Sequence, residues 1–160
     1  MSAIASFYRM PKNSVDELRT AAAPKRGFFG SSKDVYWDFI KKHGEEVASY
    51  PGSGYVLAAV VSFLQEMCGV DFSADELADL GTYLSEARQA SVFPLTREHK
   101  ERYLERLMQE HSESDLRDYY NDLFAAQDEA AGVAMKRGIA AIRQALTEID
   151  EDSFVLLQIG

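Results

Sequence analysis

The chain has 160 residues, of which 46% are apolar and 27% charged, as expected for one soluble globular domain spanning residues 1–160. Its net charge of −9 disfavours nucleic acid and anionic membrane surfaces as partners, because basic patches bind both. The acidic surface either provides solubility or attracts a basic protein partner.

The single cysteine, Cys68, excludes an internal disulfide and lies in an apolar stretch, where a buried and unreactive thiol is expected. The first residues lack the basic and apolar regions of a signal peptide. The longest apolar run, Val56–Val61, is too short to cross a bilayer. We therefore expect a cytoplasmic protein.

Two short apolar runs, Ala3–Met10 and Phe154–Ile159, predict a β-strand at each end of the chain. Chain ends are usually frayed unless they are tied into a sheet. We expect both strands in one small sheet. Two strands alone make a poor sheet, so a third is expected near Ala90–Leu95 or Val70–Phe72.

Helices are predicted in the first part of the chain from their capping residues. Ser14 and Glu17 have the spacing of a capping box before a helix over Val15–Ala22. Ser32 is expected to cap a second helix, over Lys33–His43.

A central helix is predicted over Tyr55–Cys68, because this segment is apolar on nearly every side. The next helix is predicted to begin directly after Ser73, which forms a capping box with Glu76. Phe72 and Leu77 have the spacing of the accompanying hydrophobic staple.

Three further helices are predicted from Thr96, Ser114 and Ala130, each with apolar residues three and four positions apart. The apolar face of the first is expected to consist of Tyr103, Leu104, Leu107 and Met108. The apolar positions of the last helix are expected to face inward: Val133, Ile139, Ile142, Leu146 and Ile149. The predicted class is α+β and helix-dominated. The N- and C-terminal strands lie in one small sheet covered by about six or seven helices.

No sequence motif indicates catalysis or a cofactor. Gly27–Lys33 has only two residues between its glycines and Ser-Ser before the lysine, so it departs from a phosphate-binding loop. The three histidines, His43, His99 and His111, have no metal-ligand spacing and are expected to cap helices or face solvent. Acidic runs such as Asp75–Asp79 are expected on solvated helix faces.

Aromatic residues gather around a glycine- and serine-rich segment and a second turn at Pro51–Gly54. Tyrosine and tryptophan are favoured in pockets and interfaces, although core packing is the alternative explanation. The residues predicted to bind a ligand or partner are Phe28, Phe29, Tyr36, Trp37, Tyr50 and Tyr55.

Three short segments resemble the YfbM-like bacterial proteins, a domain family of unknown function. They are Met1–Tyr8, Tyr36–Ile40 and Val155–Gly160, about a fifth of the chain. The chain departs from the family at Ile40–Gly44, where a Leu-His and Thr-Gly pattern is usual. The resemblance implies a small α+β domain and supplies no catalytic residues to transfer.

Three functions remain open at this point. The first is a non-catalytic binding or protein-interaction module that acts on a basic protein, for example as the inhibitor of a toxic enzyme. The second is an enzyme or small-molecule-binding protein with a pocket near the aromatic cluster at Phe28–Phe39. The third is a self-associating structural module, a homo-oligomer in which terminal strands pair across a two-fold axis.

Overall fold

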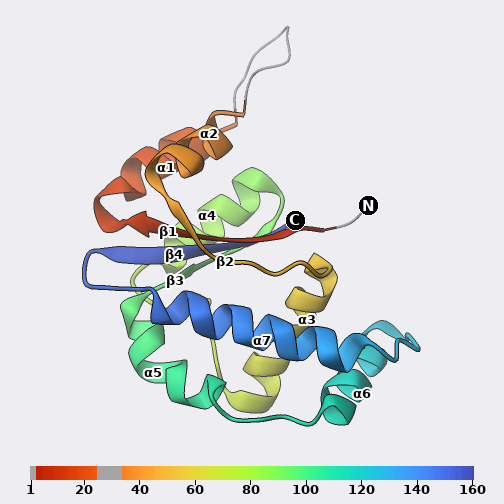
Figure 1. Ribbon diagram of the computed structural model, residues 1–160. Helices are drawn as coiled ribbons and strands as arrows, with labels where there is room; N and C mark the ends of the chain where they lie inside the picture. Colours follow the sequence, from red (N-terminus) through yellow and green to blue (C-terminus); the bar gives the residue numbers. More distant parts are fainter. Residues whose placement is uncertain (1–2, 25–33) are drawn as a thin grey trace, which may run out of the picture.

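A computed structural model describes residues 3–24 and 34–160. Among these residues, four antiparallel strands form one sheet in the order β2-β1-β4-β3 (Figure 1). These strands are β1 (Ala5–Pro11), β2 (Glu45–Ala48), β3 (Ser91–Leu95) and β4 (Ser153–Ile159). The two terminal strands are therefore neighbours at the centre of the sheet, in a register that pairs Ala5 with Ile159 and Pro11 with Ser153. This confirms the predicted α+β class.

The described residues contain seven α-helices, arranged in two layers around the sheet (Figure 1). One face is covered by α1 (Val15–Ala22), α2 (Val35–His43) and α4 (Ala78–Arg88). The other face is covered by α3 (Gly54–Cys68), α5 (Arg97–Leu107), α6 (Glu113–Phe124) and α7 (Ala131–Thr147). A short 3-10 helix, Lys12–Ser14, links β1 to α1.

Each helical layer has its own apolar core, and the two cores share β4. All seven residues of this strand are buried. Successive side chains on a strand point to opposite faces. Val155 and Leu157 accordingly lie in the core under α3 and α7, whereas Phe154 and Leu156 lie in the core under α2 and α4. A strand buried on both faces reads as a continuous apolar run.

The helix predicted at the hydrophobic centre is α3. It packs against α7, where a Cβ on Gly138 would come within 2.9 Å of Val60 and 3.0 Å of Leu57. The helix ends at Gly69, whose φ of 65° is the left-handed conformation that glycine adopts without steric cost.

The third strand, β3, lies within the predicted Ala90–Leu95 segment. The other candidate, Val70–Phe72, was wrong because those residues form no strand. The fourth strand, β2, was not predicted. It begins with two exposed glutamates, Glu45 and Glu46, and lacks the apolar alternation of a half-buried strand.

Two of the predicted caps at helix starts were wrong, and a third cannot be compared. The side chain of Ser14 does not cap α1; its hydroxyl donates to the Pro11 carbonyl, 2.6 Å away. Ser32 lies outside the described residues, and α2 begins after Asp34, whose carboxylate accepts from the Tyr36 N–H. For α6 only a start near Ser114 was predicted; the helix begins at Glu113, and the side chain of Ser112 caps it.

The second wrong cap is Ser73, because α4 begins at Ala78 rather than directly after Ser73. The N–H and hydroxyl of Ser73 both donate to Asp71. Asp75, predicted to face solvent, is buried and accepts from the Leu77 N–H. In α7, Val133 is 40% exposed instead of facing inward.

Candidate functional site

The aromatic residues singled out in the sequence are divided between different parts of the fold. Tyr36 is fully buried in the core between α2 and the sheet, and its hydroxyl donates to Oε1 of Gln158 at 2.8 Å. Burial raises the pKa of this tyrosine, and the Arg88 guanidinium lies 4.4 Å from its ring centre. Trp37 is half-buried with its ring 5.5 Å from Tyr36 and 6.3 Å from Tyr8.

The structure does not bring Tyr50 to Tyr36, because the two lie in the cores on opposite faces of the sheet. The Tyr50 hydroxyl donates to the Ala134 carbonyl at 3.2 Å. Tyr55 is half-exposed at the start of α3. Phe28 and Phe29 lie outside the described residues, as does the Gly27–Lys33 segment. Their part in a site stays a prediction.

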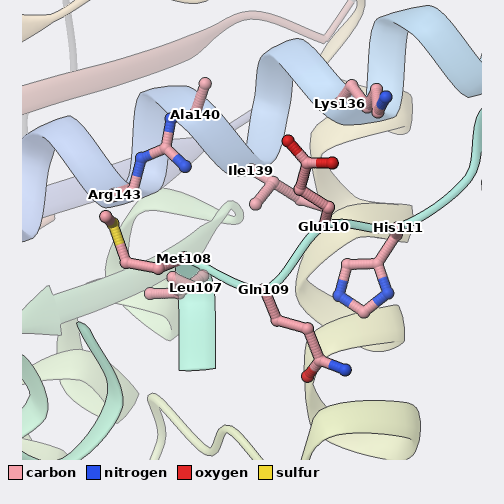
Figure 2. Close-up of a pocket in the computed structure, with 9 residues that line it drawn as sticks. All are labelled: Leu107, Met108, Gln109, Glu110, His111, Lys136, Ile139, Ala140 and Arg143. Atoms are coloured by element: carbon pink, nitrogen blue, oxygen red, sulfur yellow. The ribbon is translucent and has the colours of Figure 1, made fainter. Parts of the chain in front are cut away.

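A groove between α5 and α7 is open to solvent. It consists of two adjoining hollows, of about 720 Å³ and about 220 Å³, which share the side chain of Met108. The larger hollow lies between α5 and the turn that follows α7, at Ile149–Glu151. The smaller lies between residues 107–111 and α7 (Figure 2).

The floor of the groove is apolar. In the larger hollow it consists of half-buried Leu104, buried Ile149 and Met108, which is 62% exposed. In the smaller hollow Leu107, Ile139 and Ala140 continue the apolar floor. Exposed methionine is a flexible and polarizable contact residue, common on surfaces that bind other proteins.

The rim of the larger hollow is acidic. It contains two cations and four carboxylates, a net charge of −2, from the following residues: Arg97, Lys100, Glu101, Glu105, Asp150 and Glu151. The Arg97 guanidinium pairs with Glu101 at 2.8 Å and with Glu151 at 2.9 Å, and these hydrogen bonds raise its pKa. Because Arg97 is already paired with two carboxylates, the excess negative charge of the rim remains available to attract a basic partner.

Lys100 holds the walls of the larger hollow together. Its ammonium group donates to the carbonyl oxygens of Thr147 at 2.9 Å and Ile149 at 2.7 Å, where α7 ends. A cation in this position complements the negative end of a helix dipole. Hydrogen bonds from Ser153 and the Asp152 N–H lower the pKa of Asp150, so this carboxylate is ionised at neutral pH.

The smaller hollow has the opposite charge. Lys136 and Arg143 lie seven residues apart on one face of α7, and Glu110 is the one carboxylate in the lining, giving a net charge of +1 with histidine counted as neutral. Figure 2 shows Arg143 and Met108 at one end of this hollow, and Lys136 and His111 at the other.

Cys68 and His111 approach each other beside the smaller hollow, with Sγ 3.7 Å from Nε2. Burial raises the pKa of the thiol, so it stays protonated at neutral pH. A nucleophilic cysteine needs the thiolate. The His111 ring instead packs edge-on against Phe63, with ring centres 5.0 Å apart. The pair therefore serves as packing.

A second polar cluster, of Asp75, Thr96 and His99, is sealed inside the protein. Thr96 and the side chains of Asp75 and His99 are at most 1% exposed. The Thr96 hydroxyl donates to Asp75, and Nδ1 of His99 accepts from the Thr96 N–H. These bonds form the capping box of α5 and tie it to the preceding loop; His99 therefore caps a helix, one of the two roles expected for it, with its side chain buried.

No group of three histidine, cysteine or acidic side chains in residues 3–24 and 34–160 is placed to hold a metal ion. Within the same residues, no helix is long and apolar enough to cross a membrane. Comparisons of the chain with known protein families, with curated proteins and with solved structures found no match.

Proposed function

We propose that this protein is a non-catalytic interaction module that binds a protein partner in the groove between α5 and α7. The observation that carries the proposal is the exposed Met108 above half-buried Leu104, in an open hollow of about 720 Å³ with a charged rim. An apolar centre surrounded by polar residues is the anatomy of a protein-binding site.

The partner that suits this groove is a basic protein. The larger hollow has an excess of two carboxylates, and the whole chain has a net charge of −9. Complementary charge accelerates encounter with a basic surface and suppresses binding of acidic competitors. Such a module would bind and neutralise a basic enzyme in the cytoplasm. This activity would need neither a cofactor nor nucleic acid.

A pair of exposed methionines allows a matched test. Met108 is 62% exposed in the groove, whereas Met67 is 66% exposed at the end of α3 and does not line the groove. We expect Met108→Glu to reduce the recovery of a specific basic partner from host lysate at least about tenfold, because it places a charge at the centre of the interface. Met67→Glu should retain that partner.

The measurement is quantitative mass spectrometry of proteins retained by the immobilised wild type and both variants, at low and high salt. Thermal unfolding of each variant verifies that it is folded. Loss of the same partner from wild type at high salt would support the electrostatic contribution. Equal retention by wild type and Met108→Glu would overturn the proposed site.

A further inference from the structure

We infer that the occupant of this groove is an amphipathic α-helix of the partner, with basic residues in its N-terminal half and acidic residues in its C-terminal half. The inference rests on the proposed function and adds the conformation, direction and charge pattern of the bound segment.

The helical conformation follows from the walls of the groove. Lys100 contacts the carbonyl oxygens of Thr147 and Ile149, whereas residues 107–111 line the smaller hollow with α7 residues 136–143. The start of α5 therefore lies beside the end of α7, and the end of α5 lies beside the middle of α7. The two helices run antiparallel, and the groove runs between them. A third helix packs in such a groove by fitting its side-chain ridges between those of the walls.

The length of the groove suits a short helix. Its α5 side extends from Arg97 to Met108, eleven residue steps that span roughly 17 Å at the helical rise. A bound helix of about three turns would match this length and present apolar side chains at positions i, i+4 and i+7. These side chains would meet Leu104, Met108 and Ile139 in order along the floor.

The charge pattern follows from the difference between the two hollows. The net charge is −2 over the larger hollow and +1 over the smaller hollow, where Arg143 lies near Met108 and Lys136 at the far end (Figure 2). A bound segment is therefore favoured when its basic residues lie in the larger hollow and its acidic residues in the smaller. The positive end of a helix dipole is its N-terminus, so the N-terminus belongs at the acidic end of the groove.

Stapled helical peptides provide the probe, because a preformed helix avoids the entropy cost of folding on binding. Three fluorescent 14-residue peptides share one apolar stripe. One has a basic N-terminal and an acidic C-terminal half, the second is uniformly basic, and the third is uniformly acidic. We expect the full chain to bind the first peptide at least about fivefold more tightly than either uniform peptide in low-salt fluorescence anisotropy. A spin label at its N-terminus should broaden NMR signals near Glu151 rather than Lys136.

A charge reversal in the protein should change the preference. With Lys136→Glu and Arg143→Glu both hollows become acidic, so the uniformly basic peptide should become the tightest ligand. The matched control is Lys41→Glu with Lys42→Glu, which makes the same change in net charge on α2, away from the groove. The control protein should keep the preference of the wild type.

The outcomes separate this inference from the proposed function. An unchanged preference after the charge reversal, with binding still abolished by Met108→Glu, would overturn the charge pattern and leave the groove as the binding site. Peptide binding that is insensitive to Met108→Glu would overturn both. Self-association of the chain that Met108→Glu abolishes, measured by light scattering, would identify a second copy as the occupant and overturn the inference.

Discussion

Single polar side chains connect distant parts of this fold. Tyr36 on α2 reaches the central strand, where its hydroxyl donates to Gln158. Thr96 reaches Asp75, 21 positions earlier in the chain. Hydrogen bonds of this kind are worth most when both partners are buried, because loss of one partner leaves the other without a bond.

Two tyrosines make the stability of the folded protein depend on pH in the alkaline range. Burial raises the pKa of Tyr36 well above its ordinary value of 10.0, whereas Tyr119, whose hydroxyl donates to Glu66, has a pKa raised to about 12. An unfolded tyrosine loses its proton near pH 10, before the folded one does. The stabilisation is therefore fully present below pH 10 and is lost as the pH rises toward the folded-state pKa values.

We expect the free energy of unfolding to fall above pH 10, by up to about 1.4 kcal/mol per pH unit for a residue such as Tyr36. Tyr36→Phe should cost about 1 kcal/mol at pH 8, through the lost hydrogen bond, and should make the alkaline decline less steep. Urea unfolding between pH 8 and 11.5 measures both effects. Identical slopes for wild type and variant would show that Tyr36 does not contribute to this dependence.

The same residue-scale bonds explain why one cap was mispredicted. Ser73 and Glu76 have the spacing of a capping box, but the carboxylate of Asp71 takes both the N–H and the hydroxyl of Ser73. Asp75 is drawn inward by Thr96. A local pattern cannot anticipate a tertiary partner 21 positions away, and such partners override helix-start propensity.

At the scale of elements, the strands that the sequence predicts are those with an apolar pattern. The run in β4 is unbroken because the strand is buried on both faces, and β1 and β3 were recognisable from similar runs. The edge strand β2 has no such pattern. It is held partly from outside, since Gln144 on α7 donates to the Val47 carbonyl.

The groove was not predictable, because its walls come from two segments, residues 97–111 and 136–151, that meet only when α7 packs on α5. The periodicity of α5 correctly predicted that Tyr103 and Leu107 are buried. It also placed Met108 on that buried face, whereas this side chain follows the end of the helix and is 62% exposed.

Substitution by alanine should destabilise the protein to different extents at the two glycines of α7. A Cβ on Gly132 would overlap the main-chain carbonyl of Glu113 in α6, and backbone atoms cannot move aside cheaply. The three atoms nearest to a Cβ on Gly138 all belong to side chains, with Val60 and Leu57 the closest. Alanine is also a better helix former than glycine by about 1 kcal/mol, which offsets part of the second contact.

We expect Gly132→Ala to destabilise the protein by about 2 kcal/mol, and Gly138→Ala to change its stability by less than about 1 kcal/mol. Urea unfolding midpoints of the two variants give the comparison. Equal destabilisation would mean that the fit of α6 against α7 is no tighter than that of α3 against α7.

At the scale of the whole molecule, the two helical layers depend on each other through β4. Leu157 contributes to one core and Leu156 to the other, although the two are adjacent in the chain. If β4 is displaced, both cores lose the side chains that this strand contributes. The layers should therefore unfold together.

Hydrogen exchange tests this coupling. Leu156→Ala and Leu157→Ala should each cost about 2–4 kcal/mol through the cavity that they create. Each should lower the protection of slowly exchanging amides in both layers, α3 and α7 on one side and α2 and α4 on the other. A loss of protection confined to the layer whose core was truncated would show that the layers unfold independently.

The position of β4 has a consequence for how the protein is made. This strand follows every other element in the order of synthesis, yet both cores rest on it. Domains that complete their cores early begin to fold while the ribosome is still translating. Here β4 comes after all the other described helices and strands, so we expect their apolar faces to stay uncovered until β4 has been synthesised.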